Sequence, residues 1–156
     1  NFQILELQAA MGRVQLRKIK KIKAARKRNF DYLYKHLSKH PQLKMPEWVN
    51  GADVCWFAFP ISIYTRIANF SNYNGDKTRQ KLLPYLEKNG IETRPLFSGN
   101  ISLHPAYVSS EFRVSGELKE ADYITKHSFW ISCHPSLTQS DLEYIIKTFN
   151  NYFNGD

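Results

Sequence analysis

The segment from Glu92 to Tyr107 contains the densest group of side chains in the sequence that could bind a ligand. Arg94 carries a planar guanidinium fork that suits a phosphate or a carboxylate, and Asn100 and His104 add hydrogen-bond donors and acceptors. The segment follows a predicted strand, so it should lie at the end of a sheet, where loops often carry binding residues. A second interpretation fits equally well, a structured loop in which Arg94 pairs with a nearby carboxylate.

Few other patterns in the sequence are typical of catalysis. The seven glycines form neither a G-x-G-x-x-G motif nor a P-loop, and no nucleophile elbow occurs. His36 and His40 have the i, i+4 spacing that could share a metal ion, but no third ligand accompanies them, so no metal site is expected. Cys55 and Cys133 are too few for a disulfide framework, and both sulfurs are predicted to lie in the core. The residues alone predict no catalytic group.

Length and composition describe one ordinary globular domain over residues 1–156. The chain has 156 residues, of which 42% are hydrophobic and 14% aromatic, enough for a core and unlike a disordered chain. No run approaches the roughly 18 apolar residues of a membrane span, and no signal peptide is visible. These features predict a cytoplasmic protein with no membrane partner. Because the chain begins at Asn1 without an initiator methionine, we expect a fragment of a longer protein.

The net charge of +8 is concentrated in one segment. Nine of the 22 basic residues lie between positions 13 and 28, where no acidic residue occurs, and the rest of the chain has 13 basic and 14 acidic residues. A basic helix can bind nucleic acid or another anionic surface. A solvated face, or a face toward an acidic neighbour, is favoured because no aromatic residue is interleaved with the cations. Nucleic acid is therefore not the expected partner.

Apolar periodicity predicts a long helix followed by three strand–helix pairs. Leu7, Met11 and Val14 recur on one face of a helix over residues 2–38. The aromatic and β-branched segment 56–64 is typical of a strand, in which Pro60 indicates an edge or a bulge. The remaining predictions are a polar loop at 65–76, a helix from Asp76 to Lys88 closed by Gly90, a strand at 91–95, a turn at 98–100, a helix at 117–129, a strand at 130–133, and a helix capped by Thr138 that ends near Tyr152. This order predicts an α+β domain with helices covering a sheet of about three strands.

Several motifs, in the same order along the chain, resemble those of one protein family. Residues 1–12, NFQILELQAAMG, followed by Gln15 and Leu16, are similar to the N-x-R-[ML]-x-x-[LI]-Q-A-A-x-G-x-x-Q-L segment of the DegT/StrS-type sugar aminotransferases. The strand at 56–60, the step at 90–94 and the helix start at 134–138 match as well, so the resemblance covers the whole chain. It implies the small C-terminal domain of a fold-type-I enzyme that uses pyridoxal or pyridoxamine phosphate on nucleotide-linked sugars.

Within that family, the chain looks most like the 3-dehydratase branch, whose members make 3,6-dideoxyhexose precursors for surface polysaccharide. The stretches that carry this likeness are 94–100, 105–107, 113–118 and 129–131. Aminotransferases of the family commonly have a histidine beside the position of Leu96 and Phe97, and its absence here favours the dehydratase. The alternatives are an aminotransferase of the same family and, in another class, a stand-alone basic-helix module for nucleic acid or an acidic partner.

The resemblance also implies where the chemistry lies. The cofactor should be held mainly by a large upstream domain, which supplies a lysine in aminotransferases or a histidine in dehydratases and, in one branch, an iron–sulfur cluster. This part alone is expected to be inactive, with an exposed apolar face on helix 2–38. In the family's homodimers the asparagine matching Asn1 reaches the cofactor phosphate of the neighbouring subunit, although the family's arginine two residues on is Gln3 here. The predicted contacts to a nucleotide-linked 4-keto-6-deoxy sugar are Arg94, Phe97, Asn100 and His104.

Overall fold

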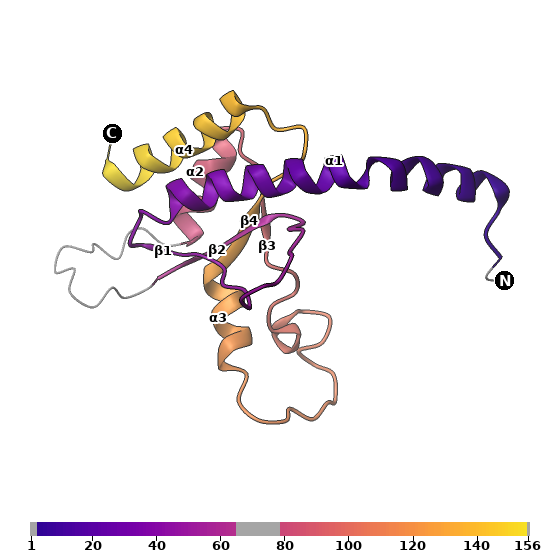
Figure 1. Cartoon of the computed structure of the whole chain (residues 1–156). Coiled ribbons are helices and arrows are strands. Elements are labelled where there is room, and N and C mark those ends of the chain that lie inside the picture. Colours follow the sequence, from indigo (N-terminus) through magenta and orange to yellow (C-terminus); the bar gives the residue numbers. More distant parts are fainter. Residues whose placement is uncertain (1–2, 65–78, 156) are drawn as a thin grey trace.

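In the computed structural model, which describes residues 3–64 and 79–155, helices pack on an antiparallel sheet of four strands (Figure 1). The predicted α+β class is confirmed. In chain order the helices are α1 (Glu6–Leu37), α2 (Arg79–Lys88), α3 (Lys119–His127) and α4 (Gln139–Asn154), with a short 3-10 helix η1 (Ile101–Leu103). The strands are β1 (Leu43–Lys44), β2 (Phe59–Ile63), β3 (Thr93–Pro95) and β4 (Ser128–Ile131).

The sheet has the strand order β1-β2-β4-β3, one strand more than the sequence predicted. The additional strand, β1, has only two residues and pairs Leu43 with Ile63 and Lys44 with Ser62. Such a short strand carries no alternation that a sequence pattern can reveal. Pro60 lies beyond this pairing and opposite Trp130 of β4. The edge predicted from Pro60 is therefore present at that end of β2, whereas its other end lies inside the sheet.

The core lies between one face of the sheet and the three helices α1, α2 and α4, and α3 contacts β2 and β4. Strand side chains alternate between the two faces, and helical side chains recur with the 3.6-residue period. The largest fully buried side chains are Phe30, Leu33, Leu37, Phe59, Ile61, Ile63, Leu82, Leu86, Phe129, Ile131, Leu142 and Phe149. Burial of a side chain of this size stabilises the fold by roughly 1.5–3 kcal/mol.

Local signals fix the ends of the helices. Thr138 caps α4: its hydroxyl accepts from the Asp141 backbone N–H at 3.2 Å, and the Asp141 carboxylate accepts from the Thr138 N–H at 2.8 Å. These hydrogen bonds lower the pKa of Asp141. Gly90, at φ +73°, follows α2 as predicted. Strand β4 begins two residues earlier than predicted, and the loop at 65–76 and the Asp76 cap lie outside the described residues.

The N-terminal half of α1 extends beyond the rest of the molecule (Figure 1). Leu7, Met11 and Val14 are exposed there, whereas Phe30 and Leu33, farther along the helix, are buried. At 3.6 residues per turn, Leu7, Met11 and Val14 lie on one narrow face of the helix, whereas the buried residues Phe30 and Leu33 lie farther round it, on an adjoining face. The apolar face predicted on helix 2–38 is thus present and exposed in the N-terminal half of α1, and the domain buries the adjoining face of the C-terminal half.

The prediction that both cysteines lie in the core is correct only for Cys133. Cys133 is buried, but Cys55 is exposed in the irregular segment before β2, so the prediction of a core position is wrong for Cys55.

The histidine pair considered as a metal site includes His40, which contacts Asn150, with 2.9 Å between Nε2 and Oδ1. Among residues 3–64 and 79–155, no three acidic, histidine or cysteine side chains gather in a group that could hold a metal ion. Within the same residues, no helix combines the length and apolarity needed to cross a membrane.

Candidate functional site

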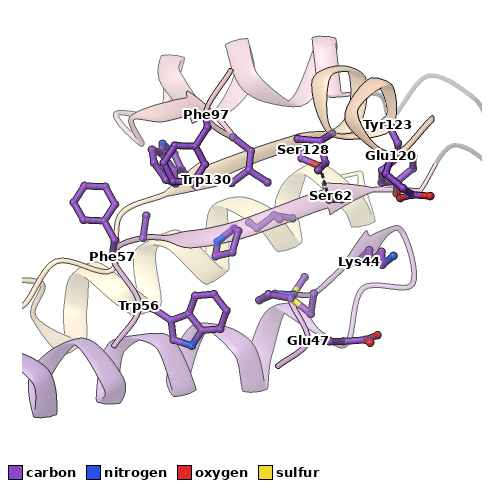
Figure 2. A pocket seen from close by; sticks show the side chains of 17 residues that line it. Lys44, Glu47, Trp56, Phe57, Ser62, Phe97, Glu120, Tyr123, Ser128 and Trp130 are labelled. Carbon is purple, nitrogen blue, oxygen red and sulfur yellow. Dashed lines mark hydrogen bonds between the residues drawn. The ribbon is translucent and has the colours of Figure 1, made fainter. Parts of the chain in front are cut away.

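The face of the sheet opposite the core forms the floor of the candidate site. Because successive side chains of a strand point to opposite faces, Pro60, Ser62, Ser128 and Trp130 share this face. Pro60 lies opposite Trp130 and Ser62 opposite Ser128 in the register of β2 and β4. The two serine hydroxyls are 2.6 Å apart and hydrogen-bonded (Figure 2). The floor is thus apolar at one end and hydroxyl-bearing at the other.

A cavity of about 600 Å³ lies over this floor, and we call it the sheet-face cleft. Its walls come from residues 44–47, from the segment before β2, from the residues that follow β3 and from α3. The aromatic end is formed by Trp56, Phe57, Phe97 and Trp130, and the polar end by Lys44, Ser62, Glu120, Tyr123 and Ser128 (Figure 2). Pockets that bind small molecules commonly have this volume and this mixture of apolar walls with a few polar groups.

Three rings meet at the aromatic end of the cleft. The Trp130 ring centroid is 4.8 Å from that of Phe97, at an interplanar angle of 69°, and 5.4 Å from that of Phe57. Phe97 nevertheless keeps 76% of its surface exposed and Phe57 keeps 71%. Aromatic residues are usually covered, since they supply much of the energy of protein cores and interfaces. Two exposed rings held against a third therefore form an unusual surface.

The loop that carries Phe97 is fixed to α3. Phe97 has φ +50°, a left-handed conformation that is uncommon for a bulky residue. Gly99 also has positive φ, and a Cβ at that position would overlap the Thr125 side chain. The Thr125 hydroxyl accepts from the Asn100 backbone N–H at 2.6 Å. The turn predicted at 98–100 therefore packs directly against α3, which holds the Phe97 ring in place.

Asn100 and His104 hold this loop together. Asn100 is buried, and its Nδ2 donates to Asp122 at 2.6 Å while its Oδ1 accepts from the Ser102 backbone N–H at 3.1 Å. The bond from Ser102 caps the short helix η1, and the bond to Asp122 ties the loop to α3. His104 Nε2 is 2.7 Å from the Ser98 carbonyl oxygen. Neither side chain lines the sheet-face cleft or the second cavity beside it, and these hydrogen bonds of both side chains lie within the loop or reach α3.

The polar end of the cleft contains a hydroxyl without a partner. The Tyr123 oxygen is buried, and no hydrogen bond reaches it within the described part of the chain. Burial raises the pKa of Tyr123, and Tyr64 and Glu120 raise it further. The Lys44 ammonium lies 5.9 Å from the centroid of the Tyr123 ring. A buried hydroxyl normally has a hydrogen-bond partner, so Tyr123 is an exception among the buried groups beside the cleft.

A second cavity, of about 430 Å³, adjoins the first, and we call it the charged cleft. Arg94 lines it and binds Glu92 through Nε at 2.9 Å and Nη2 at 2.7 Å. The loop interpretation of Arg94 is thus correct in that the residue has a local carboxylate partner. Both side chains are about 70% exposed, and an exposed ion pair contributes at most about 1 kcal/mol. An anionic ligand can therefore compete for Arg94.

Arg26, from the middle of α1, joins the two clefts. Its guanidinium donates to the Trp56 carbonyl oxygen at 3.3 Å and to that of Phe57, and lies 5.6 Å from the Phe57 ring centroid. These contacts tie the segment before β2 to the helix. Phe57 and Trp130 line both clefts. The position of the aromatic end therefore depends on a residue of the basic segment.

Sequence reasoning found part of this site. Of the four predicted substrate contacts, Arg94 lines the charged cleft and Phe97 lines the sheet-face cleft. Phe57 and Trp130 were missed. Trp130 stands between Phe129 and Ile131 in a strand, and this alternation is a signal that could have placed it opposite the core. Nothing in the sequence places Phe57 beside it.

Residues 1–150 match the family model described as the DegT/DnrJ/EryC1/StrS aminotransferase family. The chain is 35% identical over 154 residues to the lipopolysaccharide biosynthesis protein RfbH of Salmonella typhimurium, covering 98% of this chain and 33% of that protein. It is 34% identical over 152 residues to dTDP-4-dehydro-2,6-dideoxy-D-glucose 3-dehydratase of Saccharopolyspora spinosa, covering 97% of this chain and 31% of that protein.

Among solved structures, the fold resembles that of Escherichia coli GDP-4-keto-6-deoxy-D-mannose-3-dehydratase with bound hydrated PLP. The TM-score is 0.75 and the identity 25%, covering 95% of this chain and 36% of that one. The chain spans about a third of the length of these relatives. Since the family model matches nearly the whole sequence, the chain belongs to the DegT/DnrJ/EryC1/StrS aminotransferase family.

Proposed function

We propose that this chain is the C-terminal third of a nucleotide-sugar 3-dehydratase that depends on pyridoxal or pyridoxamine phosphate. Its substrate would be a CDP- or GDP-linked 4-keto-6-deoxyhexose, in the biosynthesis of deoxysugars for O-antigen. The observation that carries the proposal is the 34% identity, over 97% of the chain, to a 3-dehydratase. The dehydratase-like stretch 94–100 also contributes residues to both clefts. The alternative is an aminotransferase of the same family.

The charged cleft suits the diphosphate of such a substrate. The guanidiniums of Arg26 and Arg94 and the imidazole of His134 line it, with one carboxylate, Glu92. Guanidinium forks match phosphate oxygens in two-point hydrogen bonds. Arg94 would exchange Glu92 for the phosphate, while Arg26 keeps its contacts to the backbone before β2. In this arrangement the anionic part of the substrate would lie at the end of β3.

The loop after β3 would cover the bound substrate and exclude water from it. Phe97 reaches over the sheet-face cleft and is proposed to touch the substrate directly. Asn100 and His104 are proposed to act through the loop, because their polar atoms are engaged by Asp122, Ser102 and Ser98. A loop fixed in this way positions the Phe97 ring at little entropic cost on binding.

The cofactor is assigned to the upstream part of the whole protein. Members of this family are PLP-dependent, and the cofactor supplies the electron sink of the reaction when bound. The charged cleft does not fit the cofactor ring, because its lining residues include no lysine and its carboxylate, Glu92, is engaged by Arg94. Asn1, predicted to reach the cofactor phosphate, lies outside the described residues. An iron–sulfur cluster would likewise need upstream ligands, since this chain has two cysteines.

The exposed face of α1 supports this division of the molecule. Leu7 keeps 72% of its surface exposed and Met11 keeps 62%, whereas Phe30 in a later turn of the same helix is buried. Contiguous apolar surface of this kind marks an interface, and the upstream two thirds of the protein are proposed to cover it. We also propose that the whole protein is a homodimer, in which Asn1 faces the neighbouring subunit.

The coding sequence upstream of Asn1 provides the most direct test. A large cofactor domain in the same reading frame, with histidine at the position of the Schiff-base lysine, supports the 3-dehydratase. Lysine at that position favours the aminotransferase. Turnover of CDP- and GDP-4-keto-6-deoxyhexoses by the whole protein then decides which product forms, and its mass in solution tests the dimer. A frame without such a domain would overturn the proposal for this chain.

The basic-helix alternative makes an opposite prediction. Several cations already have protein partners: Lys23 pairs with Asp53, and Lys27 lies 2.6 Å from Asp31. Binding of duplex DNA by many cations would weaken steeply with salt, with a logarithmic slope near −0.9 for each phosphate neutralised. We expect no such binding by the purified chain at low salt. A steep salt-dependent association with DNA would instead favour the binding module.

A further inference from the structure

We propose that the sheet-face cleft receives the base of the nucleotide, stacked at the aromatic end against Phe97, Trp130 and Phe57. This inference rests on the proposed function, since it names the part of a nucleotide-linked substrate that this cleft takes. The class of ligand proposed for this cleft is a planar heteroaromatic ring that carries N–H and C=O groups on its edge. The exposed rings, the strained backbone beneath Phe97 and the polar side chains of this one cavity point to such a ligand.

Two rings of the cleft are exposed, and the backbone beneath one of them is strained. Among the described residues other than glycine, only Phe97 has a positive φ. Strained backbone of this kind persists where the surroundings impose it, and it gathers at ligand sites. Here the Asn100 and Thr125 contacts impose the strain, and the result is a ring with 76% exposure beside Trp130. Stacking on exposed aromatic rings is a common way to bind a base without reading its identity.

The polar end of the same cleft suits the edge of a base. The Tyr123 hydroxyl is buried even without a ligand, but Lys44, Ser62 and Glu120 line the cleft and are not fully buried. An apolar polypeptide segment laid over the cleft would take these polar groups out of water without giving them partners, at a cost. The edge of a base brings donors and acceptors that can bond to them. The chemistry of the cleft therefore fits a base better than an apolar cover.

The charged cleft lies beside the aromatic end of the sheet-face cleft. Phe57, Ala58 and Trp130 line both cavities, so a ligand can extend from one into the other. A base over Trp130 would then have its diphosphate near Arg94 and Arg26. The volume of about 600 Å³ lies within the range of small-molecule sites. The sheet-face cleft and the charged cleft thus lie side by side, as the base and the diphosphate do in a nucleotide.

The test measures binding of GDP, CDP and dTDP to the ¹⁵N-labelled chain by NMR, with inorganic pyrophosphate and ribose 5-phosphate as ligands without a base. The three tryptophans give three indole N–H signals, and the ring current of a stacked base should move the Trp130 signal most. Phe97→Gly removes the ring while allowing the left-handed backbone. Phe112→Gly is the matched control, an exposed phenylalanine that lines neither cleft.

We expect the nucleoside diphosphates to bind more tightly than pyrophosphate and to shift the Trp130 indole signal. Phe97→Gly should weaken their binding roughly tenfold and leave pyrophosphate unaffected, and Phe112→Gly should change nothing. Equal affinity for GDP and pyrophosphate, no effect of Phe97→Gly, or no binding of any nucleotide overturns the inference. The proposed function is judged separately, by the upstream residue and by turnover.

Discussion

Phe97 is held in a backbone conformation that costs energy, and glycine at this position should recover part of it. At φ +50° a side chain crowds the backbone, and the left-handed region costs a non-glycine residue about 1–2 kcal/mol. Phe97→Ala removes the ring but keeps this cost. Phe97→Gly removes the ring and the cost together. The comparison of these two variants isolates the backbone term, because both lose the same ring contacts.

The expected magnitudes follow from the exposure and contacts of the ring. With 76% of its surface exposed, Phe97 gains only about a quarter of the roughly 1.5–3 kcal/mol of full burial, plus about 0.5–1.5 kcal/mol from its contact with Trp130. Phe97→Ala should therefore be destabilised by roughly 1–2 kcal/mol. Glycine adds freedom to the unfolded chain worth about 0.5–1 kcal/mol. Phe97→Gly should thus exceed Phe97→Ala in stability by about 0.5–1 kcal/mol.

Urea unfolding followed by tryptophan fluorescence measures this difference. The free energies of unfolding are comparable if both variants show the same dependence on urea concentration. A matching difference of about 2 °C in Tm is expected for a chain of this length. If Phe97→Gly proves no more stable than Phe97→Ala, the backbone at this position is not strained. Strain beneath Phe97 then no longer supports a base site in the sheet-face cleft.

Three further outcomes are expected. Gly99→Ala should be destabilised by more than about 2 kcal/mol, because Gly99 has positive φ and a Cβ there would overlap Thr125 of α3. Gly116 has a similar φ but open space around it, so Gly116→Ala should lose only about 1 kcal/mol of stability. Equal losses of stability in the two variants would contradict the packing of the loop on α3. Cys55 should react quickly with a thiol reagent, whereas Cys133 should react only on unfolding, since burial raises the pKa of its thiol; rapid modification of both would show that the core opens. Because the pKa of Asp141 is lowered from 3.8, its stabilising effect is complete above that pH and is lost as the pH falls through the folded-state pKa. Lowering the pH should therefore destabilise the unchanged protein more than it destabilises the Asp141→Asn variant. Identical profiles of stability against pH for the two proteins would refute this role of Asp141.

Features set by neighbours along the chain could be predicted from the sequence. The long helix appears as Glu6–Leu37, the cap of α4 forms through Thr138 and Asp141, and Gly90 follows α2. Capping, turn chemistry and apolar periodicity act over three or four residues, so their signals survive without the fold. Motif order indicated the family in the same way, because it needs only the sequence.

Features set by distant residues became visible only in the tertiary structure. Phe57, Phe97, Tyr123 and Trp130 come from four separate segments, and the antiparallel pairing of β2 with β4 and the seating of the loop on α3 bring them to one cleft. Arg94 was predicted from its residue type and Phe97 from the resemblance to the family, whereas the hydrogen bonds of Asn100 within the loop became visible only in the structure. Such contacts depend on packing across the whole chain, and a linear pattern does not encode which surfaces will meet. The sequence by itself therefore determined the helices and the family, and the tertiary structure determined the cleft.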